Sequence, residues 1–394
     1  MYRKFSADHL FTGHELLHAD PVLITGIDGS IEALVDKKDA GDDIETFKGI
    51  LTPGFINAHC HLELSHMKGL IPKHTGLVEF VEQVMGKRTA IEEEKMAAMM
   101  LAEKEMYDNG IVAVGDICNT ADSVPVKQNS KLRWHNFIEV SGFVDAGAVK
   151  RLEEMKKVYG LFQIASHRFQ TTLSPHAPYS VSKKLFQLLN EETADQLITI
   201  HNQECAAENE LYQNKGGGFL QLYKNFGIDI AGFEPTLKSS LQSWLPYFTK
   251  NQSLILVHNT FTGKDDLLFA RSSIGVDRKI SFCLCPNANQ YIEAAMPPIA
   301  LLRQNNVDIL IGTDSYASNT QLNILEEMKT IQQKASPDIP FEEILKWATI
   351  NGARALQMDE VLGSFEKGKK PGVVLIDAMD EMNFTVRSKA KRII

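Results

Sequence analysis

Two histidines near the start of the chain have the spacing of a metal site. His59 and His61 are separated only by Cys60, at the end of an apolar run. In an extended strand, residues two apart face the same side, so both imidazoles can point at one ion while Cys60 points away. A His-x-His pair joined by a distant histidine and an aspartate offers four nitrogen and oxygen ligands. That set suits zinc or another borderline divalent metal, with a position left for water.

Further polar residues of the same kind stand at the ends of other apolar runs. His176, His201 and His258 each end or directly follow such a run, and another run leads into Asp314. Five of the chain's 12 histidines therefore lie at such ends, which chance explains poorly. Each residue alone has an ordinary structural explanation, since Asp314, for example, could cap the helix that follows it. Their shared placement favours one common site.

The apolar runs that must position these residues have strand length and alternate with segments of helical periodicity. This alternation is typical of parallel β/α architecture, and eight strand–helix units predict an α/β fold in the form of a (β/α)₈ TIM-type barrel. Because chemistry in such barrels collects at the carboxyl ends of the strands, the histidines and Asp314 are expected together at one end. The predicted strands are residues 54–59, 111–117, 135–140, 170–174, 197–201, 254–258, 280–285 and 307–312.

The two ends of the chain have a different texture. Short β-like pieces at 22–27 and 31–35 surround a turn signal, and two more, 373–376 and 384–386, lie near the C-terminus. We predict one small β-sandwich domain made of residues 1–52 plus 358–394. Residues 53–357 are predicted to form the catalytic barrel.

Composition excludes several other classes of protein. The 394 residues contain 41 Lys and Arg against 50 Asp and Glu, a net charge of -9, and no basic run stands out. A nucleic acid polymer is therefore not expected as a partner. The first residues lack the order of a secretory signal, and no apolar stretch of about 18 residues occurs, so we expect a cytoplasmic protein with no membrane partner.

Taken together, these segments resemble the motifs of the amidohydrolase superfamily. Residues 52–61, Thr-Pro-Gly-Phe-Ile-Asn-Ala-His-Cys-His, resemble its opening metal motif, and the other matches follow in the family's order over nearly the whole chain. They are Ser174-Pro-His-Ala-Pro-Tyr179, His201-Asn-Gln-Glu204, Leu256-Val-His258, Cys285-Pro-Asn-Ala-Asn289, Gly312-Thr-Asp-Ser315 and Gly363-Ser-Phe-Glu-Lys-Gly-Lys-Lys370.

Within the superfamily, the chain is most similar to the aminohydrolase branch, which holds adenosine-type, S-adenosylhomocysteine and aminodeoxyfutalosine deaminases. Branches with two metals bridge them with a modified lysine near the end of strand four, and run four here ends without a lysine. The resemblance therefore implies one divalent metal per subunit, Zn²⁺ or alternatively Fe²⁺, held by His59, His61, His201 and Asp314. It also implies a homodimer.

The resemblance implies catalytic roles for Glu204, His258 and Asp314. A metal at this site would lower the pKa of its bound water to about 7. Glu204 would give a proton to the ring nitrogen and later to the leaving ammonia, and His258 would orient the water. Asp314 would take the water's proton, and Ser315 would orient Asp314. The alternative for Glu204 is a solvated carboxylate in the first turn of a helix.

The expected substrate is a small heterocyclic amine, a purine or an adenosine-like compound. Aminodeoxyfutalosine is one candidate, because the segment from His59 to Glu63 looks like the His-x-His-Leu-Glu opening of the deaminases that use it. Glu63 is a candidate for a ribose hydroxyl, and His176 and Asn289 are candidates for other substrate contacts. The alternative for Glu63 is a structural hydrogen bond or salt bridge.

Three other residues could reach the substrate or lie on the surface. Arg88 and Arg133 could each pair with a substrate carboxylate, and His66 lies in the loop that follows the first run; surface positions are the alternative for all three. Two other functions also remain. A chlorohydrolase or cyclic amidase could use the same site. A non-catalytic scaffold on the same fold is the remote alternative, because such scaffolds have usually lost metal ligands and this chain keeps every expected one.

Overall fold

The computed structural model describes residues 2–18, 20–166, 169–273, 279–334 and 339–394. Each of the eight predicted runs forms a strand, and the strands build two four-stranded parallel sheets, ordered β11-β10-β9-β8 and β12-β13-β14-β15. Nearly every residue of these strands is buried, as expected of parallel sheets covered on both faces. The strands are β8 (Phe55–Cys60), β9 (Ile111–Cys118), β10 (Arg133–Val140), β11 (Gln170–Pro175), β12 (Leu197–Asn202), β13 (Ser253–His258), β14 (Ile280–Leu284) and β15 (Asp308–Ile311).

Backbone hydrogen bonds link the two sheets near the carboxyl ends of their edge strands. The amides of Thr313 and Asp314 donate to the carbonyl of His59 at 3.0 and 3.1 Å, and the amide of His201 donates to the carbonyl of His176 at 3.0 Å. The predicted α/β architecture with parallel strands is confirmed. Continuous strand pairing is confined to each of the two sheets. Closure of these sheets into one barrel therefore stays a prediction.

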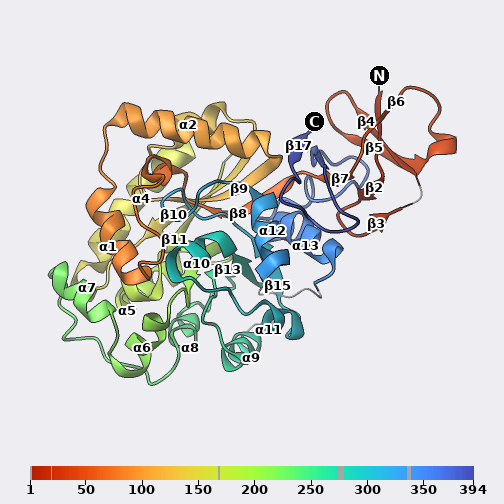
Figure 1. The fold of residues 1–394 in the computed structure, drawn as a ribbon. Coiled ribbons are helices and arrows are strands. Elements are labelled where there is room, and N and C mark those ends of the chain that lie inside the picture. Colours follow the sequence, from red (N-terminus) through yellow and green to blue (C-terminus); the bar gives the residue numbers. More distant parts are fainter. Residues whose placement is uncertain (1, 19, 167–168, 274–278, 335–338) are drawn as a thin grey trace.

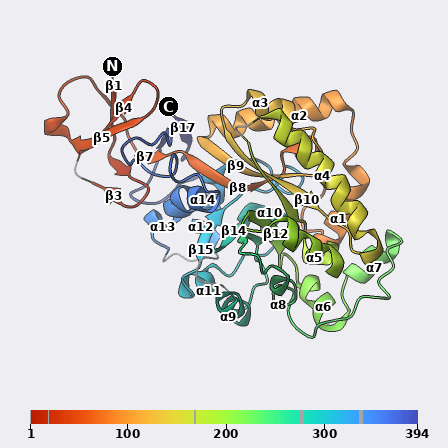
Figure 2. The same ribbon diagram turned by 180° about the vertical axis from the view of Figure 1, so that it is seen from behind.

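Helices cover the outer faces of the two sheets (Figures 1 and 2). Among the described residues, no helix has the length and apolar character needed to cross a membrane. The helices are α1 (Leu77–Lys87), α2 (Glu92–Asp108), α3 (Val124–Asn129), α4 (Ala148–Ala165), α5 (Lys183–Glu192), α6 (Ala206–Asn214), α7 (Phe219–Asn225), α8 (Ser240–Trp244), α9 (Lys264–Ser272), α10 (Pro286–Glu293), α11 (Ile299–Gln304), α12 (Ile324–Lys334), α13 (Phe341–Ala348) and α14 (Ile350–Ala355).

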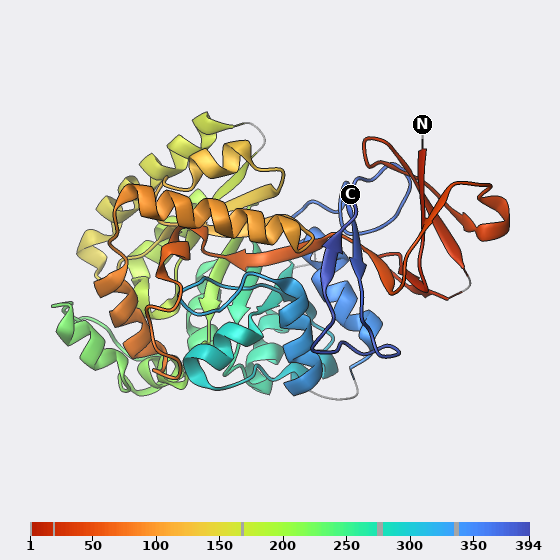
Figure 3. The same cartoon turned by 45° about the horizontal axis from the view of Figure 1, so that its top comes forward.

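Strands from both ends of the chain share a sheet beside the parallel strands (Figure 3). One sheet has the order β5-β4-β1-β6, and the other has the order β17-β16-β7-β2-β3, in which β16 pairs antiparallel with β7. Phe5 and Leu23 of the first sheet share a buried cluster with Leu51 and Leu375 of the second. The strands are β1 (Tyr2–Ser6), β2 (His9–Phe11), β3 (Leu16–Leu17), β4 (Pro21–Gly26), β5 (Ile31–Asp36), β6 (Ile44–Thr46), β7 (Ile50–Pro53), β16 (Val373–Ile376) and β17 (Ala390–Arg392).

One predicted piece of these sheets is wrong. Residues 384–386 do not form a strand, because Thr385 enters a turn in which its amide donates to Ser388 Oγ at 2.9 Å, and Val386 is 87% exposed. The strand that pairs with β16 is β17 instead. The pairing of the two termini is thus observed, and the exact domain limits stay a prediction.

Candidate functional site

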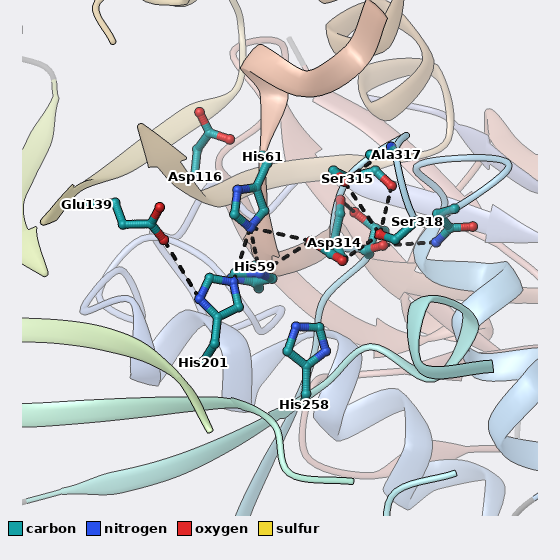
Figure 4. Close-up of polar contacts among 12 residues, drawn as sticks. His59, His61, Asp116, Glu139, His201, His258, Asp314, Ser315, Ala317 and Ser318 are labelled. Atoms are coloured by element: carbon teal, nitrogen blue, oxygen red, sulfur yellow. Dashed lines mark hydrogen bonds and ion pairs between the residues drawn. The ribbon is translucent and has the colours of Figure 1, made fainter. Parts of the chain in front are cut away.

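Three imidazoles and one carboxylate meet at the carboxyl ends of β8, β12 and β15 (Figure 4). His61 Nε2 lies 3.2 Å from His59 Nε2 and 3.2 Å from His201 Nε2. Asp314 Oδ1 lies 3.6 Å from His59 Nε2 and 3.4 Å from His61 Nε2. All four side chains are buried. The structure therefore brings the four predicted metal ligands together.

Hydrogen bonds alone cannot satisfy this cluster. His201 Nδ1 lies 2.8 Å from the carbonyl oxygen of His176, which only accepts, so Nδ1 carries the proton and Nε2 offers a lone pair. His61 Nε2 faces two other ring nitrogens, and one proton there could serve only one of them. Burial lowers the pKa of His61 to about 4 and also lowers that of His201, so both rings are neutral at pH 7.

The spacing of these atoms suits a divalent metal. Four ligands around a tetrahedral ion, with bonds of about 2.0–2.1 Å, lie roughly 3.3 Å apart. The separations among His59, His61 and Asp314, and between His61 and His201, run from 3.2 to 3.6 Å. Neutral imidazoles and a carboxylate are also the chemical donors that zinc and iron accept. The residues present fit a metal ion.

The backbone at these strand ends is adapted to the site. A Cβ atom on Gly312 would lie 2.8 Å from His59 Cβ and 2.9 Å from Cys283 Sγ, so only glycine lets the chain after β15 approach β8. His258 and Asp314 have φ angles of 72° and 57°, in the left-handed region that non-glycine residues rarely occupy. Such strained residues cluster at functional sites.

Asp314 is oriented by a residue that the sequence did not single out. Ser318 Oγ donates to Asp314 Oδ2 at 2.5 Å. Ser315, the predicted orienting residue, instead accepts from the amide of Ala317 at 3.2 Å and lies 3.4 Å from Ser318 Oγ, and it lines the cavity. The contact of Ser315 with the carboxylate is therefore indirect, through Ser318.

Electrostatics keep Asp314 ionised. Burial alone would raise the pKa of this carboxyl, but the hydrogen bond to His59 and the interactions with His61 and His258 outweigh burial and hold the pKa below its usual range. The side chain is thus a carboxylate that can bind a cation or accept a proton.

Glu204 and His258 face each other beside the cluster. Glu204 Oε1 lies 3.5 Å from His258 Nε2, and both side chains are buried. Burial, reinforced by the charge of Asp314, raises the pKa of Glu204 well above its usual range and so favours the protonated carboxyl. Burial lowers the pKa of His258 to about 4, which leaves its ring neutral.

Asn289 lies behind His258 rather than in the cavity. Its Oδ1 lies 2.8 Å from His258 Nδ1, so it accepts the ring proton there and leaves the lone pair of Nε2 facing Glu204. Asn289 was predicted as a substrate contact. In the structure its side chain sets the tautomer of His258.

Except for His59, Asn289 and Ser318, the polar side chains of this site line one cavity of about 340 Å³. Helix α1 supplies an apolar wall on one side, and polar residues from the loops after β9, β10 and β11 supply other parts of the lining. The lining includes His61, His201, Glu204, His258, Asp314, Ser315, Leu77, Phe80, Val81, Val84, Met85, Arg88, Asn119, Thr120, Glu139, Ser141, Arg151 and His176.

The predicted substrate contacts divide into two groups. His176 lines the cavity, and its ring centroid lies 5.0 Å from that of His201. Glu63 does not line the cavity, because its carboxylate accepts from the amides of Asn119 and Thr120 at 3.0 and 3.1 Å and lies 3.6 Å from Arg88 Nη2. Burial raises the pKa of Glu63 to about 7.

The structure also shows where Arg88, Arg133 and His66 lie. Arg88 lines the cavity. Arg133 is exposed at the first position of β10, at the opposite end of that strand from the cavity. His66 Nε2 donates to the carbonyl oxygen of Arg88 at 2.9 Å, and His66 does not line the cavity.

Sequence reasoning missed Glu139, Asn119 and Ser318. Glu139 and Asn119 also stand at strand ends, after apolar stretches of β10 and β9. The same strand-end signal was available for these two residues, but neither has a neighbour of metal-binding type at a regular spacing to distinguish it from an ordinary polar residue.

Several known proteins are similar to this chain in sequence or in fold. A 5-methylthioadenosine/S-adenosylhomocysteine deaminase of Thermoanaerobacter pseudethanolicus is 27% identical over 366 residues, which cover 86% of this chain and 76% of that protein. The solved structure of Helicobacter pylori aminofutalosine deaminase in complex with methylthio-coformycin is similar over 100% of both chains, with a TM-score of 0.82 and 22% identity. An adenosine deaminase from Xanthomonas campestris with bound zinc is similar over 98% of this chain and 86% of that one, with a TM-score of 0.72 and 21% identity. A model of the amidohydrolase family matches residues 50–393, and the chain belongs to that family.

Proposed function

We propose that this protein is a metal-dependent hydrolase that deaminates an adenosine-like nucleoside or a related purine derivative. The observation that carries the proposal is the cluster of four potential metal ligands, three of which line one cavity together with Glu204, a buried carboxylic acid whose pKa is raised by burial. Activation of water needs the cluster, and expulsion of ammonia needs an acid. Family membership and the deaminases among the similar proteins support the reaction class.

The protein's own groups supply the proton transfers of this reaction. A divalent cation would be held by His59, His61, His201 and Asp314 and would supply a nucleophilic water at neutral pH by lowering its pKa. The lone pair of His258 Nε2 accepts a hydrogen bond from that water and orients it toward the ring carbon. The Asp314 carboxylate receives the water's proton.

Glu204 acts on the ring that is attacked. Its proton goes to the ring nitrogen as the carbon–oxygen bond forms, which prevents negative charge from building up on the ring. Once the carbon is tetrahedral, the carboxylate of Glu204 takes the proton of the new hydroxyl group and passes it to the amino group; Asp314 later releases the water's proton to solvent, from which Glu204 regains its own. The carbon–nitrogen bond then breaks, and ammonia and the oxo product leave.

The finer features rest on the same resemblance. We infer Zn²⁺ as the metal, with Fe²⁺ as the alternative, because the donor set suits both and a structural relative holds zinc. We also infer that the two parallel sheets close into a (β/α)₈ barrel of residues 53–357. Residues 1–52 plus 358–394 would then be a small β-sandwich domain, and the protein a cytoplasmic homodimer.

The decisive experiment measures ammonia release by the purified, metal-loaded protein. The panel contains adenosine, 5′-substituted adenosines including 5-methylthioadenosine and S-adenosylhomocysteine, aminodeoxyfutalosine, guanine, cytosine and chlorinated triazines. We expect ammonia from one or more of the adenosine derivatives. Chloride release from the triazines without ammonia from any amine would favour the chlorohydrolase alternative, and silence across the aminated panel with metal bound would refute the proposal.

A further inference from the structure

Glu139 presents a buried and unpaired carboxylate oxygen to the catalytic cavity. It stands near the carboxyl end of β10, is 8% exposed and lines the cavity. Its Oε2 accepts a hydrogen bond from Asn119 Nδ2 at 2.7 Å. Its Oε1 has no hydrogen-bond partner within the described parts of the chain. A buried acceptor of this kind is normally satisfied, so a group from outside the chain is the expected partner.

Glu139 lies near His176 and His201, but His201 has no donor atom left for a second metal ion there. The nearest ring nitrogen is His201 Nδ1, 3.7 Å from Oε1, and that nitrogen already donates its proton to the carbonyl oxygen of His176 at 2.8 Å. It has no lone pair to offer a cation. The other nitrogen of the same ring faces His61 and the metal cluster, so Glu139 lies on the opposite side of His201 from the proposed metal (Figure 4).

The surroundings of Glu139 define the chemistry of its partner. A carboxylate can only accept hydrogen bonds, so the partner must donate. The guanidinium groups of Arg88 and Arg151 line the same cavity and disfavour a cationic partner, whereas the Glu139 carboxylate itself disfavours an anion. Neutral donors remain, and the pair of adjacent hydroxyls on a ribose is the neutral donor pair that a nucleoside offers. Oε1 has both lone pairs free and Oε2 retains one, so the carboxylate can accept from two neighbouring hydroxyls at once.

Glu63, the residue that the sequence favoured for a sugar hydroxyl, serves Glu139 indirectly. Its carboxylate holds the backbone amides of Asn119 and Thr120, and the side chain of Asn119 then donates to Glu139. The carboxylate of Glu63 therefore has its hydrogen-bond partners within the protein. Oε1 of the neighbouring Glu139 has none among the described residues.

We propose that Glu139 binds the vicinal hydroxyls of the substrate's ribose and makes the site selective for ribonucleosides over their 2′- and 3′-deoxy analogues. The inference rests on the proposed function, since it names which part of a nucleoside the cavity recognises. It places the sugar next to His176 and β10, on the far side of His201 from the reacting centre.

The test uses nucleosides that a deaminase does not consume. Binding of inosine, 2′-deoxyinosine and 3′-deoxyinosine to the metal-loaded protein is measured by calorimetry for the wild type, Glu139→Gln and Glu139→Ala. The matched control is Glu103→Gln, another carboxylate that accepts from a side chain, Ser130, but lies outside the cavity. Metal content and melting temperature are recorded for every variant.

We expect the wild type and the control to bind inosine about 10- to 100-fold more tightly than either deoxy analogue, the range for a hydrogen bond to a charged group. The preference should shrink to within about threefold in Glu139→Ala and take an intermediate value in Glu139→Gln, whose amide oxygen still accepts.

Two results would overturn the inference: a wild type that does not discriminate, or variants that weaken all three ligands equally. Should Glu139→Ala fail to fold, the intermediate preference of Glu139→Gln still decides. Discrimination without ammonia release from any adenosine derivative would refute the proposed function and leave the sugar site standing.

Discussion

Among single residues, Glu204 separates deamination from other reactions of an activated water. It is a buried acid whose pKa is raised by burial, and it is not among His59, His61, His201 and Asp314. We expect Glu204→Gln to keep its metal and to lower kcat by about 10²–10⁴, because the amide cannot transfer a proton. Steady-state ammonia release and metal analysis measure both effects.

A matched control is Glu210→Gln, an exposed residue on α6 that should keep full activity. Full activity in Glu204→Gln would remove this residue from the mechanism. Loss of metal in the same variant would instead assign it to the metal cluster.

The metal ligands should resist acid more than ordinary histidines do. The pKa of His61 is about 4, lowered by burial, so its ring becomes protonated only as the pH falls toward 4, whereas an ordinary histidine is mostly protonated at pH 5.5. Because protons compete with metal for the same nitrogen, we expect metal to be retained at pH 5.5 and lost between about pH 5 and pH 4. Dialysis at graded pH followed by elemental analysis tests this, and a midpoint of loss near pH 6.5 would contradict it.

The sequence predicted which residues form the site better than it predicted the contacts of their neighbours. His59, His61, His201 and Asp314 could be found because a metal needs defined residue types, and strand ends bring such residues together. The direction of a neighbouring side chain has no such signature. Glu63, for instance, turns to amides 56 and 57 positions later in the chain, so its contacts depend on the packed fold.

At the level of elements, the close approach of β15 to β8 holds the proposed metal ligands His59 and Asp314 in place. Asn57 of β8 donates to Thr313 Oγ1 at 2.8 Å and accepts from the Thr313 amide at 3.0 Å, directly beside Gly312. A methyl group on Gly312 would collide with His59. We expect Gly312→Ala to lower the free energy of unfolding by roughly 1–3 kcal/mol and to weaken metal binding, because overpacking displaces the strand that carries His59.

Urea denaturation and metal titration measure the two effects. Gly160→Ala is the control, since a Cβ at this position in α4 meets nothing within 4 Å and alanine favours a helix. Its stability should be equal or higher. Unchanged metal affinity in Gly312→Ala would show that the approach of the two strands does not position His59.

The elements themselves were largely predictable. All eight parallel strands appeared as apolar runs, because strands buried on both faces need apolar side chains almost throughout. The short terminal strands were harder. Residues 384–386 have β-forming side chains, yet the hydrogen bonds of Thr385 and Ser388 form a turn there, and β17 lies at the more polar segment that can reach β16. Pairing across the length of the chain overrides local preference in such short pieces.

At the scale of the whole molecule, the last strand, β17, is hydrogen-bonded to the segment that leads into β9 of the parallel sheet. Arg392 of β17 donates from Nε to the carbonyl of Tyr107 at 2.8 Å and from Nη2 to the carbonyl of Ile111 at 2.5 Å, and its guanidinium lies 4.0 Å from the centre of the Tyr107 ring. Those carbonyls flank the turn that leads from α2 into β9. The two ends of the chain are thereby linked to the amino-terminal end of the sheet, opposite the catalytic cavity.

We predict that loss of the Arg392 contacts lowers the stability of the protein without lowering its catalytic rate. Arg392→Ala removes one hydrogen bond from each carbonyl, although the Tyr107 carbonyl still accepts from the Gly110 amide at 3.1 Å, so we expect the free energy of unfolding to fall by about 1–3 kcal/mol. Because β9 contacts the site only at its other end, kcat per bound metal should stay within about twofold of the wild type. Arg387→Ala, an exposed arginine five residues earlier, should change neither quantity. A drop in kcat at full metal occupancy would mean that the terminal strands reach the active site through β9, and an unchanged stability would mean that the pairing of β16 with β7 alone holds the C-terminal segment in place.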